Sequence, residues 1–174
     1  MPLTVGALVA VGLGVYGKEH QPSGRAITSL GFPDLITMKL WLASAAAALA
    51  LVQLVSALRM YGKIGGGTPP GWVGPLHRTS GALAVLVSLP VAFHCLWSLG
   101  YQDYENRVLI HSLAGCVFYG AFVSKMLTLR SRRLPTWALP LFGGLVFAAI
   151  IVVWLTSALW YFRTFGLPGG GGAY

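Results

Sequence analysis

Five apolar stretches dominate the chain, and short polar segments separate them. Windows of about 19 residues, the length that spans roughly 30 Å of hydrocarbon, place these stretches at Pro2–Tyr16, Leu35–Met60, Leu76–Gly100, Val108–Leu129 and Pro135–Phe162. Each stretch predicts a membrane helix. The first stretch is short and rich in glycine, so a tilted or partly re-entrant segment is an alternative to a full span. The pattern therefore predicts an all-α, polytopic membrane helix bundle of about five transmembrane helices.

Glycine and proline mark the connections between these stretches, most plainly over residues 65–71. The spacing favours a single transmembrane domain over residues 1–165. Four consecutive glycines near the end of the chain predict a flexible glycine-rich tail over residues 166–174.

The composition excludes a soluble enzyme. Hydrophobic residues make up 56% of the chain, charged residues only 9%, and the mean hydropathy is +0.71. So few charges cannot cover a water-soluble globule, whereas a bundle that meets lipid does not need them. The net charge of +8 does not indicate nucleic-acid binding, because the basic residues stand singly between apolar runs.

The distribution of basic residues predicts the orientation. Seven of the 12 Lys and Arg residues lie on the side that holds the loops after the second and fourth stretches, and all four acidic residues lie on the opposite side. By the positive-inside rule, the amino terminus is expected inside and the carboxyl terminus outside. We expect a multi-pass protein of a bacterial plasma (inner) membrane.

Three of the four histidines lie within predicted membrane helices, where an ionisable side chain is a functional hypothesis by default. His94 lies near the outer end of the third stretch and His111 near the outer start of the fourth. The midpoint between them falls in the loop 101–107, so antiparallel helices would put both imidazoles at one depth. Two such rings in an apolar bundle are what a six-coordinate b-type haem requires, so we expect haem b with His94 and His111 as its iron ligands.

His77 could serve a second haem. It lies 17 residues before His94, about 25 Å along a straight helix, so it cannot ligate the same iron. Another ligand would be needed on the inner side, where Met60 and Met126 are the only plausible sulfur ligands. The alternative for His77 is a hydrogen bond to a neighbouring helix.

Two segments, 77–81 and 111–115, share the pattern H-x-x-x-G. The spacing puts Gly81 and Gly115 on the same helix face as His77 and His111, one turn on. The absent side chain would leave room for a flat macrocycle or for a close neighbouring helix. We therefore add both glycines to the expected cofactor-binding residues.

The segment 111–115, which reads His-Ser-Leu-Ala-Gly, resembles the H-S-x-x-G segment of the cytochrome b561 group. The region 76–129 is similar to this group and to the wider ferric-reductase-like transmembrane haem proteins. The chain also resembles a small membrane-protein family of actinobacteria. The cytochrome resemblance implies haem b held by paired histidines, with electron transfer from a reductant such as quinol. The group has two histidine pairs, whereas this chain offers one complete pair.

Several alternatives stay open at this point. The histidines could bond between helices in a non-haem accessory or assembly subunit of a larger membrane complex, and small-residue faces leave homo-oligomers open. His20 is read as a solvated loop residue, with docking or proton relay as the alternative. Arg107 and Lys39 could pair with haem propionates. No nucleophile with a base and no phosphate loop is evident, so an oxidoreductase or electron-transfer role is the only enzymatic reading.

Overall fold

The computed structural model describes residues 1–131 and 134–168, which form helices and no strand. This confirms the all-α class. The tail predicted to be flexible lies outside the described residues from position 169 onward. The elements are α1 (Pro2–Glu19), α2 (Leu35–Met60), α3 (Val73–His94), η1 (Cys95–Leu99), α4 (Asn106–Arg130), α5 (Ala138–Trp154), η2 (Leu155–Leu159) and α6 (Trp160–Phe165), where η marks π-helical turns.

Four of these helical segments are long and apolar enough to cross a membrane: Leu35–Met60, Val73–Leu99, Asn106–Arg130 and Ala138–Phe165. The chain is therefore a multi-pass membrane protein. Helix α1, the short first stretch, is not among the four, because its glycines and its charged carboxyl end lower its hydropathy.

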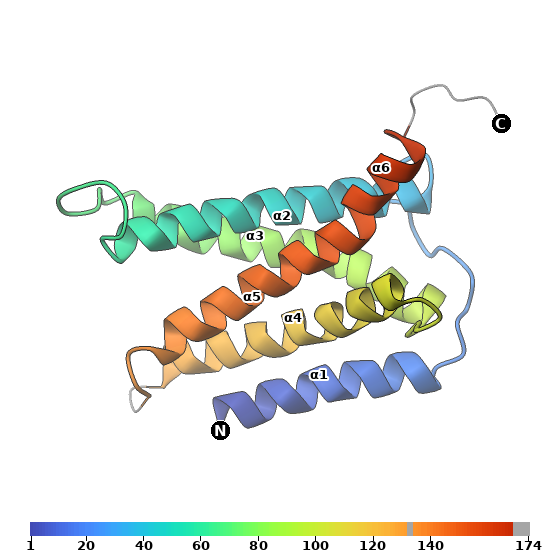
Figure 1. The fold of residues 1–174 in the computed structure, drawn as a ribbon, viewed down its shortest axis with the longest axis horizontal. Coiled ribbons are helices and arrows are strands. Elements are labelled where there is room, and N and C mark those ends of the chain that lie inside the picture. The colour runs from blue at the N-terminus through green and yellow to red at the C-terminus, as the bar shows by residue number, and fades with distance from the viewer. Residues whose placement is uncertain (132–133, 169–174) are drawn as a thin grey trace.

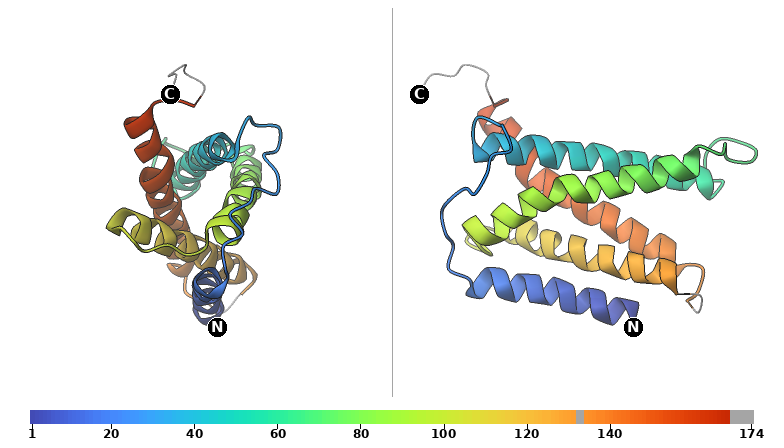
Figure 2. Two further views of the ribbon diagram at one scale, coloured as in Figure 1. Left: turned by 90° about the vertical axis from the view of Figure 1, so that its right-hand side faces the viewer. Right: turned by 180° about the vertical axis from the view of Figure 1, so that it is seen from behind.

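The helices run back and forth along one axis (Figure 1). Helix α2 packs along α3, α4 packs along α5, and α5 crosses α2. Helix α1 packs on α4 and lies outside the four longer helices (Figure 2). One end of the bundle holds the connection 20–34, the turn η1 and helix α6, and we call it the His111 end. The opposite end, which holds Met1 and the loop 61–72, is the His77 end.

Small side chains allow close packing in the middle of the bundle. The buried cluster there consists of Ala46 and Ala50 from α2, Phe118 from α4, and Ala149 and Ile150 from α5. Small residues let helix backbones approach closely in a membrane, where there is little hydrophobic driving force between helices.

Glycines also set the contact between α1 and α4. A Cβ atom added at Gly120 would lie 2.8 Å from the Cβ of Ala10 and still closer to the carbonyl oxygen of Gly6. The hydroxyl of Ser124 donates a hydrogen bond of 3.1 Å to the carbonyl of Pro2. Helix α1 is therefore held against α4 at a distance that only glycine permits.

Polar side chains fix both ends of α2. At its start, Asp34 accepts hydrogen bonds of 2.8 Å from the backbone N–H and 2.7 Å from the hydroxyl of Thr37, which lower the pKa of the Asp34 carboxyl. At its end, the guanidinium of Arg59 donates to the carbonyls of residues 64–68 at 2.5–3.4 Å. The glycine-rich loop therefore wraps around the Arg59 side chain.

The two π-helical turns lie near the two expected haem ligands. Turn η1 follows directly after His94, and Pro90, which has no backbone N–H, lies one turn before it inside α3. Turn η2 interrupts the last membrane helix at residues 155–159, opposite the start of α4. Single π-turns inside α-helices are frequent at functional sites.

Candidate functional site: the histidines of the bundle

His94 lies in the interior at the His111 end of α3, with 1% of its surface exposed. Its Nδ1 is 2.8 Å from the carbonyl oxygen of Pro90. A carbonyl can only accept, so Nδ1 carries the proton and Nε2 keeps its lone pair. Within the described part of the chain, this Nε2 is buried and has no hydrogen-bond partner. Such an atom needs an explanation, because a buried polar group without a partner costs about 1–3 kcal/mol.

His111 is held in the same way by another helix. Its Nδ1 lies 3.2 Å from Oγ1 of Thr156 in η2. The Thr156 hydroxyl donates its own proton to the carbonyl of Val152, at 2.7 Å, and therefore accepts from Nδ1 of His111. With the proton on Nδ1, the lone pair of a neutral His111 ring lies on Nε2.

A cavity of about 310 Å³ lies beside His111. Helices α3 and α4 make almost no close contact with each other, and the cavity fills the space between them. A hydrogen bond of 2.9 Å between Ser88 and Tyr119 joins the two helices nearby, and Tyr119 is part of the cavity wall. The walls are mainly apolar and include Leu13, Ala92, Cys95, Leu96, Leu99, Val108, Gly115, Cys116 and Tyr119.

Gly115 opens onto this cavity. Nothing lies within 4 Å of a Cβ atom added there, so the missing side chain leaves free space next to His111. The predicted role of Gly115 in binding a cofactor stays a prediction. The two cysteines, Cys95 and Cys116, are free and line the same cavity.

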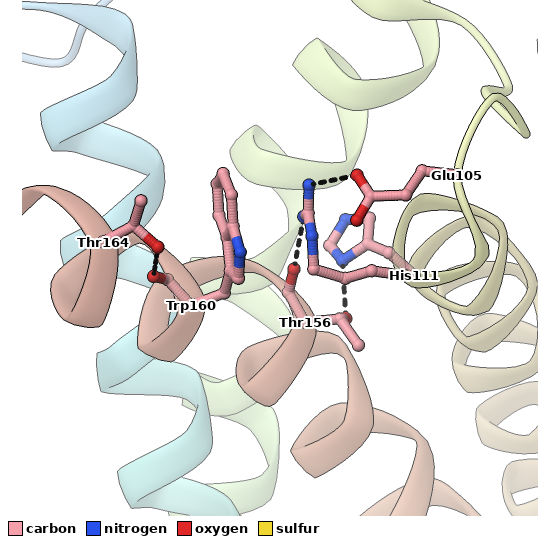
Figure 3. A network of polar contacts seen from close by, with 6 residues as sticks. Glu105, His111, Thr156, Trp160 and Thr164 are labelled. Atoms are coloured by element: carbon pink, nitrogen blue, oxygen red, sulfur yellow. Dashed lines mark hydrogen bonds and ion pairs between the residues drawn. The ribbon is translucent and has the colours of Figure 1, made fainter.

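Arg107 belongs to a network of polar contacts next to His111, and Figure 3 shows Glu105, Thr156 and Trp160 of that network. Its guanidinium lies 3.7 Å from the centre of the Trp160 ring, donates to the Thr156 carbonyl at 2.9 Å, and pairs with Glu105 at 3.2 Å. The network joins α4 to η2 and α6. It keeps a positive charge near His111.

His77 lies at the other end of the bundle, so the structure does not bring it together with His94 and His111. Its Nδ1 is 2.8 Å from the hydroxyl of Ser56 on α2. Gln53 donates to the His77 carbonyl and to Ser80, and its side chain occupies the space in front of Gly81. Gly81 therefore makes room for a neighbouring helix rather than for an open cavity.

The candidate sulfur ligands near His77 are not buried. Met60 is 39% exposed and Met126 is 45% exposed. A haem ligand is normally enclosed with its cofactor, so neither methionine has the surroundings expected of a partner for His77.

His20 is not the solvated loop residue that its polar neighbours in the sequence indicated. Its ring stacks on Tyr16 and on Trp97, with centroid distances of 5.1 Å and 4.6 Å. The backbone N–H groups of Ser23 and Gly24 donate to carbonyls of η1 at 3.1 Å. The connection after α1 therefore packs across the end of α3, and the stacking of the His20 ring contributes to this packing.

Charged residues reinforce this end of the molecule. Lys18 at the end of α1 pairs with Asp103 at 2.7 Å, and this hydrogen bond raises the pKa of the exposed Lys18 amine. The pair links α1 to the loop that connects η1 with α4. Because both side chains are more than half exposed, the pair contributes little to stability.

The partners of the histidines were not found by sequence reasoning. Thr156 and Ser56 are ordinary helix hydroxyls in the sequence, and their side chains back-bond to their own helices. The available signal was weak: a hydroxyl residue at about the same depth as each membrane histidine. The carbonyl of Pro90, four residues before His94, was visible only as a proline inside an apolar run.

The family to which the chain belongs follows from comparison with known sequences. No curated protein and no solved structure matches the chain. The resemblance to cytochrome b561 therefore stays a prediction. A model described as a family of unknown function, DUF6529, matches residues 1–169. Since this model covers nearly the whole sequence, the chain belongs to the DUF6529 family.

Proposed function

We propose that this membrane protein is a b-type cytochrome in which His94 and His111 bind one haem b through their Nε2 atoms. The buried, unpartnered Nε2 of His94 is the observation that carries the proposal. An iron ion would provide the partner that this atom lacks. The bound haem would supply one-electron exchange between ferric and ferrous iron, while the protein tunes its potential through ligands and burial.

The donor set fits this cofactor. Metal-binding histidines generally donate their other ring N–H to a carbonyl or a similar oxygen, which fixes the tautomer and the ring orientation. Both His94 and His111 show this arrangement, with Pro90 and Thr156 as the acceptors. Each would therefore present a neutral imidazole with a free lone pair.

The cavity beside His111 supports the proposal on the side of that ligand only, because His94 is not among the residues that line it. The cavity between α3 and α4 is mainly apolar, and Gly115 leaves one wall flat. Apolar walls keep water from an iron site, and one or two polar groups at the edge suit the propionates of a haem. Arg107 is a cation that could pair with them, because it directly precedes Val108 of the cavity wall on α4.

The face of the membrane at which the haem exchanges electrons is proposed from the predicted orientation of the chain. With the amino terminus inside a bacterial plasma membrane, the His111 end would face outward. The haem would then accept electrons from a quinol or a similar reductant in the lipid and pass them to a redox partner at the outer face.

A second candidate function is a non-haem accessory or assembly subunit of a larger membrane complex. The hydrogen bonds from His77 to Ser56 and from His111 to Thr156 favour it, because both join neighbouring helices without any cofactor. In this case the protein would contain no haem when haem is in ample supply.

Histidine variants of the full chain test the proposal. We expect His94→Ala and His111→Ala to lose haem, and His20→Ala and His77→Ala to retain one haem per chain. Added imidazole should restore a low-spin spectrum in His111→Ala, because that side chain borders the cavity. Retention of full haem by His94→Ala and His111→Ala, each with native helix content, would refute the ligand assignment.

A second pair of variants tests the cavity. Gly115→Leu should fill the space next to His111 and lower haem content. Gly143→Leu is the matched control, because an added Cβ at Gly143 also meets nothing within 4 Å but lies on α5 away from the cavity. Equal haem content in the two variants would place the haem elsewhere.

A further inference from the structure

The π-helical turn η2 brings a hydroxyl to His111 from a helix remote in sequence. Thr156, the second residue of η2, lies 45 positions after His111, and its Oγ1 is 3.2 Å from Nδ1 of the ring. The same hydroxyl donates to the carbonyl of Val152. The Thr156 hydroxyl therefore donates its single proton within its own helix, and its oxygen accepts a hydrogen bond from His111.

This contact selects one of the two neutral forms of the ring. With the proton on Nδ1, the lone pair of the neutral ring is on Nε2, which is then the atom that can bind a ligand. Without an acceptor near Nδ1, a neutral histidine has no reason to keep its proton there. Thr156 therefore favours Nε2 as the nitrogen of His111 that can bind a ligand.

The backbone of Thr156 supports the same geometry. Its carbonyl accepts from Arg107, which precedes His111 by one helical turn on α4 and also lies over Trp160 (Figure 3). Two consecutive contacts, one from the side chain and one from the backbone of Thr156, thus fasten the first turns of α4 to η2. A turn of the His111 ring would break the contact with the Thr156 side chain.

We propose that Thr156 is a positioning residue that holds His111 as the Nδ1-protonated tautomer, with Nε2 free to bind a ligand. The inference rests on the proposed function for what that ligand is, but the tautomer itself does not depend on haem. Loss of a hydrogen-bonded neighbour of a metal-binding histidine typically weakens metal binding 10–100-fold.

The test uses the full-length protein in detergent with ¹⁵N-labelled histidine. In the haem-free protein at pH 8, the His111 resonances should report protonated Nδ1 in the wild type and in Thr156→Ser. Thr156→Val has nearly the same shape but no acceptor, and we expect its His111 to shift toward the Nε2-protonated form. Ser157→Ala is the matched control, because the Ser157 hydroxyl donates to the carbonyl of Val153 and, among the described residues, forms no hydrogen bond with His111.

Haem binding gives the second readout. The affinity for haem should fall at least about tenfold in Thr156→Val and recover in Thr156→Ser. An unchanged tautomer in Thr156→Val would overturn the inference, and so would an equal change in Ser157→Ala. Failure of the proposed function is distinguishable, because then no variant binds haem while the tautomer still responds to Thr156.

Discussion

Replacing Gly120 with alanine should separate α1 from α4. The new Cβ would lie 2.8 Å from the Cβ of Ala10, about 0.6 Å short of ordinary contact at 3.4 Å, and closer still to the carbonyl of Gly6. Neither atom is the end of a flexible side chain. The strain can be relieved only by moving one whole helix, because no rotamer change is available.

The expected cost lies in the upper half of the range for overpacking, about 2–3 kcal/mol in the free energy of unfolding. Gly12→Ala on α1 is the control, since a Cβ there meets nothing within 4 Å. That change should alter stability by no more than about 1 kcal/mol, and in the stabilising direction if alanine favours the helix. Both substitutions add one methyl group, so the difference between them isolates the contact of α1 with α4.

Unfolding in mixed detergent micelles, followed by circular dichroism as the fraction of denaturing detergent rises, measures this difference. The double variant Gly6→Ala with Gly120→Ala should cost less than the sum of the two single variants, because one separation of the helices relieves both contacts. Equal stability of the Gly120→Ala and Gly12→Ala variants would show that α1 does not pack on α4 through these glycines.

Three smaller predictions concern helix ends and the space between α3 and α4. Arg59→Lys keeps the charge but not the planar fork that meets the carbonyls of residues 64–68, so limited proteolysis should cut that loop faster. Asp34→Ala should lower stability by about 1 kcal/mol near neutral pH. The folded-state pKa of Asp34 is depressed, so its contribution is present above the ordinary carboxyl pKa of about 3.9 and is lost as the pH falls further; thermal melts of the wild type and Asp34→Ala should therefore converge in acid. Tyr119→Phe removes the hydroxyl that bonds α4 to α3 and should cost about 0.5–1.5 kcal/mol, measured by the same micelle titration.

The helices were predictable because each needs a long apolar run to meet lipid. Residues 35–60 form a helix with the predicted bounds, and the fourth predicted helix differs from α4 by two residues at its start and one at its end. The last stretch was predicted as one helix from Pro135, whereas helix α5 begins at Ala138 and gives way to η2 at residue 155. A π-turn depends on which neighbouring side chains meet the helix, and hydropathy along the sequence does not contain this information.

The sequence pointed to some features of the candidate site, whose role in binding haem stays a prediction. Matching depth along antiparallel helices singled out His94 and His111, and the glycine spacing singled out Gly115, which does open onto the cavity. The same spacing was equally good for Gly81, where Gln53 fills the space. Rotation of each helix about its own axis decides such outcomes.

The hydrogen-bond acceptors of the histidines could not be predicted from the sequence for a related reason. Thr156 reaches His111 only because η2 packs on the start of α4, and His20 is covered only because its loop folds back over Trp97. Both contacts join segments far apart in the chain. Local sequence patterns do not report which distant segments meet.

The most direct test of the central claim is the visible spectrum of the purified full-length protein, oxidised and then reduced with dithionite, with haem measured per chain. The account predicts about one haem b per chain, with the sharp reduced α-band of a six-coordinate, bis-histidine iron. Absence of haem after expression with an ample haem supply would contradict the account.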